Sequence, residues 1–141
     1  MILHLARNRR RSVVAVESAI VLPVAIMVIL GIVVGALAVA TYQQVAAVAR
    51  EAARYASVHG EEYAATNLNN NPAATEATVY TNAIEPRLIN MKTDNLTYSV
   101  TWAPNKKREQ GWVTVTIGYT MAMPLYGTMT FTSTSTLMML W

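Results

Sequence analysis

The sequence predicts an α+β fold in which a long helix packs on a small antiparallel sheet of about three strands. An apolar stretch of membrane length fills residues 13–41 and continues, without a helix breaker, into an amphipathic stretch over residues 42–60. Beyond about residue 96, apolar residues recur at every second position, which is typical of strands with one buried face. The apolar stripe of the helix is therefore expected to face the sheet and form the core.

The chain divides into a basic leader (1–12), a transmembrane helix (13–41), an amphipathic helical extension (42–60) and a small extracytoplasmic α+β domain (61–141). The charge-free residues 19–40 would form a helix about 33 Å long, enough for a hydrocarbon layer of about 30 Å. Beyond residue 49, seven basic and seven acidic residues cancel. The leader carries the basic excess in its four arginines, Arg7, Arg9, Arg10 and Arg11. The positive-inside rule then predicts a single-pass protein with a cytoplasmic N-terminus.

Glu17 is an isolated charge, because no other charged residue occurs between Arg11 and Arg50. An acidic side chain at the centre of a bilayer costs roughly 2.5 to 3.5 kcal/mol, and less toward the edge. Two explanations stay open. The carboxylate either snorkels to the lipid headgroups or pairs with a cation supplied by another group.

Three further residues mark the apolar helix. Pro23 removes a backbone hydrogen bond and tends to bend a helix. Gly31 and Gly35 form a small-xxx-small pair that lets a second helix approach closely. Glycine is also simply common in membrane helices, so a helix contact at this pair is one of two interpretations.

Helical spacing places several small apolar residues on one face of the extension, which we expect to end near Gly60. A second helix is predicted from about Thr75 to about Asn90, weakened by Pro86. The period-two runs cover residues 96–102, 113–120 and 128–132, and the last is expected to run on toward Leu140. They predict a three-stranded meander. The run Thr128–Thr136 fits either an adhesive, sheet-extending edge or, as we favour, the solvent face of a strand.

Several function classes lack support in the sequence. Cysteine is absent, which excludes disulfides and thiol chemistry. His59, Glu61 and Glu62 lie in one loop without the spacing of a closed metal site, and no glycine-rich phosphate loop occurs. Only Lys106–Arg108 offers a basic cluster on the outer domain, and a solvated hairpin loop accounts for it. We therefore expect no enzyme activity, no metal or other cofactor, and no nucleic-acid partner.

Two motifs carry a family resemblance. The run RRRSVVAVESAIVLP (residues 9–23) and the run VAREAARYA (residues 48–56) resemble TadE-like proteins, which are pilin-like components of the Tad branch of type IV pilus systems. The resemblance covers about residues 7–60 well and the remainder only in character. It implies a pseudopilin-like fold and places the protein in the bacterial cytoplasmic (inner) membrane.

The resemblance also implies a role for Glu17. In this family a prepilin peptidase removes the leader, and the glutamate is the fifth residue of the mature chain. The cut would fall between Ser12 and Val13, and Glu17 of one subunit would pair with the freed α-amino group of its neighbour. Two departures from the family pattern are Ser12, where glycine is usual, and Ser18, where an aromatic residue is usual. An uncut chain would instead act as a membrane-anchored assembly factor.

Taken together, these expectations describe a non-enzymatic minor pilin or pseudopilin of a Tad-type (tight adherence) pilus. Its partners would be the membrane, other pilins and pseudopilins, and the pilus assembly platform. The alternative is a secreted or single-pass membrane-anchored binding or scaffold domain unrelated to pili. Ala38-Val39-Ala40 resembles a signal peptidase site and would release such a domain.

Overall fold

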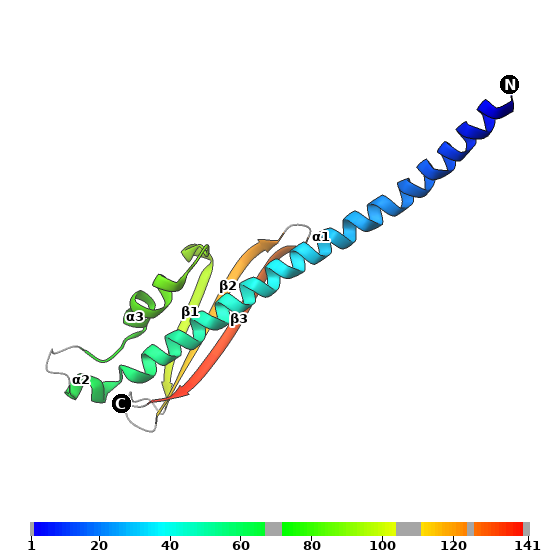
Figure 1. Cartoon of the computed structure of the whole chain (residues 1–141). Helices are drawn as coiled ribbons and strands as arrows, with labels where there is room; N and C mark the ends of the chain where they lie inside the picture. The colour runs from blue at the N-terminus through cyan, green and yellow to red at the C-terminus, as the bar shows by residue number, and fades with distance from the viewer. Residues whose placement is uncertain (1, 67–71, 104–110, 124–125, 140–141) are drawn as a thin grey trace. The chain divides into compact units, whose positions relative to one another are not determined.

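The computed structural model describes residues 2–66, 72–103, 111–123 and 126–139, with side chains in the first helix described from Val14 onward and those of residues 62 and 66 left out. The chain forms two compact units, Met1–Ala38 and Val39–Trp141. The first is purely helical, and the second holds the sheet and the core (Figure 1). The predicted Lys106–Arg108 loop lies outside the described residues.

Helix α1 runs from Ile2 to Val58 as one element of 57 residues, which confirms the continuous long helix. Pro23 lies inside α1 and does not end it. Because proline has no N–H, the carbonyl of Ala19 lacks its usual donor at this point. Between residues 13 and 40 Glu17 is the only charged residue, and nothing in the sequence favours ending the helix before the amphipathic extension.

The three predicted strands are present and form an antiparallel sheet in the order β1-β2-β3. Strand β1 (Leu96–Ala103) pairs with β2 (Trp112–Met123), and β2 pairs with β3 (Gly127–Met138). The β2–β3 connection uses Gly127 with φ at +74°, a value that glycine adopts without the steric cost of a side chain. These findings confirm the α+β class and the three-stranded meander.

One face of the sheet and the second half of α1 share a single apolar core. The inner face of β2 contributes side chains that are fully or almost fully buried, and α1 contributes small ones that let the backbone lie close to the sheet. From β2 these are Val113, Val115, Ile117 and Tyr119; from α1 they are Val45, Val48, Ala49, Ala52, Ala53 and Ala56. The apolar stripe of the extension therefore packs on the sheet of its own chain.

The opposite face of the sheet is a ladder of threonines. Hydroxyl groups on β2 and β3 hydrogen-bond across the strands at 3.0 to 3.1 Å. Gly118 interrupts the ladder, and a Cβ built there would lie 2.5 Å from Thr97 Oγ1. The Thr97 hydroxyl occupies that space and donates to the Gly118 carbonyl at 3.3 Å. The bonded pairs are Thr114–Thr136, Thr116–Thr134 and Thr120–Thr130.

Short helical turns connect α1 to the sheet. They are α2 (Glu61–Thr66), α3 (Glu76–Val79), the π turn η1 (Tyr80–Ile84) and the 3-10 turns η2 (Glu85–Arg87) and η3 (Thr93–Asn95). The helix predicted from Thr75 begins there, because Thr75 and Thr78 cap each other's backbone N–H groups. Its predicted end at Asn90 is wrong. Pro86 has no N–H to continue the helical ladder, so the segment tightens into η2 and ends at Arg87.

Candidate functional site

The first half of α1, Val14–Ala38, presents apolar side chains that its own chain leaves almost uncovered. Its large apolar residues, Val34 apart, are between 42% and 73% exposed, from Leu30 to Met27. A helix that is apolar on all sides is stable only against lipid or against other helices. Of the described helices, α1 alone is long and apolar enough to cross a membrane, which makes it a candidate membrane anchor.

Glu17 is exposed on this half of α1 and makes no ion pair with any described side chain. A shallow hollow of about 310 Å³ lies beside it, lined by Glu17, Ser18, Val21, Leu22 and Ala25. These positions recur at helical spacing on one face. The Glu17 carboxylate therefore lies at the N-terminal end of a strip of small and branched side chains. No lysine or arginine occurs in Val14–Ala38 that could neutralise the carboxylate from within the same half.

The remaining predicted residues lie on the same helix. Gly31 and Gly35 are exposed, and a Cβ built at either would meet no atom within 4 Å, so the chain itself gives no reason for glycine. Ser12 and Val13 lie in α1 beside the arginines of the leader. The side chains of these leader residues, including Arg7, Arg9, Arg10 and Arg11, lie outside the described part of the structure.

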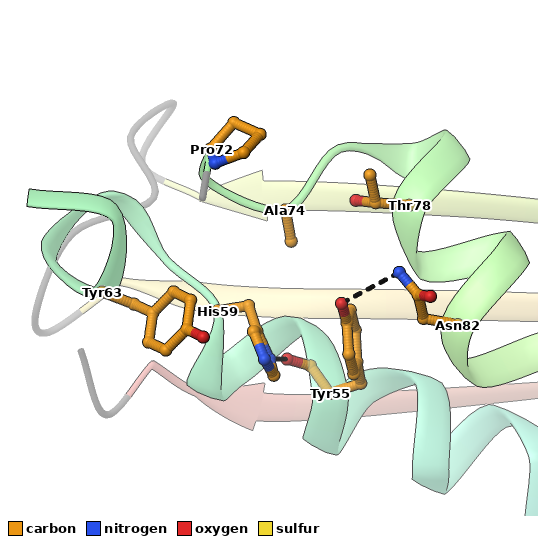
Figure 2. Close-up of a pocket in the computed structure, with 7 residues that line it drawn as sticks. All are labelled: Tyr55, His59, Tyr63, Pro72, Ala74, Thr78 and Asn82. Atoms are coloured by element: carbon orange, nitrogen blue, oxygen red, sulfur yellow. Dashed lines mark hydrogen bonds between the residues drawn. The ribbon is translucent and has the colours of Figure 1, made fainter. Parts of the chain in front are cut away.

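A second feature lies where α1 ends. A cavity of about 240 Å³ lies between the end of α1, α2 and the α3–η1 segment, and Figure 2 shows the side chains that line it. The His59 ring stacks on Tyr55, with 4.1 Å between centroids, and meets the edge of Tyr63 at 4.6 Å. The remaining lining residues are Pro72, Ala74, Thr78 and Asn82.

Hydrogen bonds in this pocket join elements of the fold. His59 Nδ1 lies 2.9 Å from the Tyr55 carbonyl, and since a carbonyl only accepts, this nitrogen carries the proton. Asn82 Nδ2 donates to the Tyr55 hydroxyl at 3.1 Å, which joins η1 to α1 across 27 residues. The described residues hold no group of three or more His, Cys, Asp or Glu side chains that could bind a metal.

The sequence interpretation missed this aromatic pocket. Tyr55, His59 and Tyr63 are four residues apart, a spacing that stacks side chains on one helical face. That signal was present in the sequence. The partner Asn82 lies far along the chain, and nothing in the local sequence predicts its contact with Tyr55.

Comparison with known proteins gives a family match that lies within α1. The model of the family described as TadE-like protein matches residues 13–54, which includes Glu17 and the exposed half of the helix. No curated protein and no solved structure gives a significant match. The matched segment begins at Val13, the first residue after the predicted cut. Residues 13–54 are therefore a TadE-like segment, as the two sequence motifs predicted.

Proposed function

We propose that this chain is a non-enzymatic, membrane-anchored minor pilin or pseudopilin that helps to assemble a Tad-type pilus. One observation carries the proposal: the TadE-like segment coincides with a continuous helix whose first half is apolar, uncovered by its own chain, and charged only at Glu17. Such a half-helix suits a lipid environment, and its small residues allow neighbouring helices to pack on it. The second half is already occupied by the sheet, so assembly would use Val14–Ala38.

The chemistry of Glu17 supports assembly through an ion pair. A carboxylate in an apolar layer is stabilised only if a cation approaches and hydrogen-bonds to it. Removal of the leader between Ser12 and Val13 would create one, the α-amino group of Val13. That amine lies about 6 Å along the helix axis from Glu17 of the same chain. A neighbouring subunit would bring its own amine to the same carboxylate, which would set the axial register between two helices.

The same proposal fixes location and partners. The leader arginines would hold the N-terminus on the cytoplasmic side of the bacterial inner membrane, and the unit Val39–Trp141 would lie outside it. Gly31 and Gly35, open on the helix surface, would admit a neighbouring helix of another pilin or pseudopilin. The further partners are the assembly platform and a prepilin peptidase that accepts Ser12 at the cut.

The test compares two glutamates of α1 in cells that carry the complete pilus system. Glu17→Gln removes the charge in the first half of α1. The matched control Glu51→Gln removes a charge on the solvent-exposed side of the second half. Loss of a buried ion pair costs about 3–5 kcal/mol, so we expect Glu17→Gln to reduce pili per cell by at least about tenfold. We expect Glu51→Gln to assemble as the wild type does. Equal piliation in all three strains would contradict the proposal.

One observation favours a second candidate, a released extracytoplasmic binding domain. The compact unit Val39–Trp141 begins within the sequence Ala38-Val39-Ala40, which resembles a signal peptidase site. Intact-mass measurement separates the candidates. Loss of 12 residues supports the pilin, loss of 40 residues supports the released domain, and an uncut chain supports an anchored assembly factor or an unrelated scaffold, which the piliation assay tells apart.

A further inference from the structure

The two edges of the sheet differ in what covers them. The edge formed by β1 is covered by another part of the chain. Alternate residues of an outer strand point their N–H groups away from the sheet, where they need a partner. The N–H of Val100 donates to Glu76 Oε1 of α3 at 3.2 Å. The Tyr80 ring stacks on Tyr98 with 4.8 Å between centroids. The segment from α3 to η1 therefore lies against β1 and prevents another strand from pairing there.

The edge at β3 is open. Strand β3 is 12 residues long and pairs only with β2, and the described residues place no hydrogen bond on its other side. Gly127–Met138 contains no charged residue and no proline. Natural proteins protect an exposed edge with charges, prolines, bulges or a covering element. The strand itself has neither charges nor prolines, and no described element forms hydrogen bonds along its free edge. A row of unpaired N–H and C=O groups of this length is a template for one more strand.

Side-chain exposure on β3 points to the same missing strand. On the core side of the sheet, Met129 is 40% exposed and Leu137 is 38% exposed, whereas Val115 in the middle of β2 is fully buried. A fourth strand beside β3 would cover these side chains with its own. The threonine hydroxyls on the other face are bonded to β2, so the backbone edge, rather than the threonine ladder, is the unused bonding surface.

The open edge does not suit a second copy of this chain. Copies repeated along a filament would bring the β1 edge of one to the β3 edge of the next, and β1 is closed by Glu76 and Tyr80. Two copies meeting through β3 would pair antiparallel about a two-fold axis. Such a two-fold contact is closed and joins only two copies, so it cannot repeat along a filament.

We propose that the free edge of β3 binds an uncharged, extended segment of a different polypeptide by β-strand addition. The main-chain groups of the segment pair with β3. Its apolar side chains on the core side cover Met129 and Leu137, and its hydroxyl or β-branched side chains continue the threonine ladder. This edge is separate from Glu17, so its role is independent of assembly through the first half of α1.

The test uses the full chain in detergent micelles and a defined probe. The probe is a nine-residue peptide of alternating threonine and valine, N-methylated at every second residue so that only one of its edges can hydrogen-bond. Thr134→Lys places a charge on the edge strand. Thr116→Lys places the same charge on the central strand and is the matched control, because both substitutions break the same Thr116–Thr134 hydrogen bond. Binding is measured by fluorescence anisotropy and by amide hydrogen exchange.

We expect the peptide to slow amide exchange in β3 and not in β1. We expect Thr134→Lys to weaken binding at least about tenfold, since an edge lysine is a natural block to strand pairing, and Thr116→Lys to change it less than threefold. Thr132→Lys, opposite Gly118, replaces Thr134→Lys if that variant does not fold. Three results would overturn the proposal: no protection of β3, equal weakening by both lysines, or concentration-dependent pairing of the chain through β3 without peptide.

Discussion

The two halves of α1 share one helical geometry and differ in what surrounds them. Between Val39 and Val58, small side chains pack against the sheet, and six of them belong to the core. Between Val14 and Ala38, large apolar side chains stand exposed, with Glu17 among them. The same hydrophobic effect acts on both halves. The second half satisfies it within the chain, and the first half is left uncovered by the described residues, as is typical of a candidate membrane anchor.

The difference shows in the size of the side chains. Alanine dominates the half that meets the sheet, because close approach of a helix to a twisted sheet leaves little room. Valine, isoleucine and leucine dominate the other half, as lipid-facing residues do. The free energy of unfolding of the second unit, Val39–Trp141, should therefore depend on side chains in the second half of α1 and not on those in the first.

The largest expected effect comes from a matched pair of valines. Val45 is fully buried and Val28 is 55% exposed. We expect Val45→Ala to lower the free energy of unfolding of the second unit by about 2–3 kcal/mol, through lost apolar burial and a cavity. Val28→Ala should change it by less than about 0.5 kcal/mol. Thermal unfolding in micelles, followed by near-UV circular dichroism, measures both, and equal shifts would show that the halves are not distinct.

A smaller effect tests the sheet on which the second half packs. An added methyl at Gly118 would meet the Thr97 hydroxyl, so we expect Gly118→Ala to destabilise the second unit by about 1–2 kcal/mol. Thr97→Ala removes the obstructing atom. The double variant should then be more stable than the sum of the single changes predicts. Additive effects would mean that the two residues do not share the space.

The smallest effect concerns the ion pair between Glu51 and Arg87, which join α1 to η2 at 2.9 Å. Both side chains are well exposed, at 39% and 45%. We expect Glu51→Gln to cost under about 0.5 kcal/mol, because surface ion pairs contribute little, and the cost should fall as salt is added. Urea unfolding at low and high salt measures this. A loss of unfolding free energy above about 2 kcal/mol would show that the second half of α1 is held to the rest of its unit by charge as well as by packing.

The sequence predicted the elements that depend on local pattern. The absence of a breaker predicted the continuity of α1 from residue 13 onward, although not its start at Ile2, and period-two alternation predicted all three strands. Features that depend on distant residues were not predictable. Glu76 caps Val100 across 24 residues, and the fit of Thr97 into the space at Gly118 requires the strand register. Helix α2 was missed because its six residues are too few to show a helical period.

The candidate site was predictable for a different reason. Glu17 stands out from the sequence because an isolated charge in an apolar run is costly if the run lies in a bilayer or a packed interior. The described side chains supply no cation that pairs with Glu17. The open question is whether, as proposed, the α-amino group of a neighbouring subunit does.

The central claim is tested most directly by zero-length carbodiimide cross-linking of the assembled protein in membranes. Val13 and Glu17 of one chain also lie about one helical turn apart, so a cross-link within a chain must be distinguished from one between chains. Unlabelled and ¹⁵N-labelled chains are therefore mixed before assembly is reconstituted. The account predicts chains that begin at Val13 and an amide between Glu17 and the Val13 amine that joins light and heavy peptides. Chains that keep the leader, or amides found only within one isotope, would contradict it.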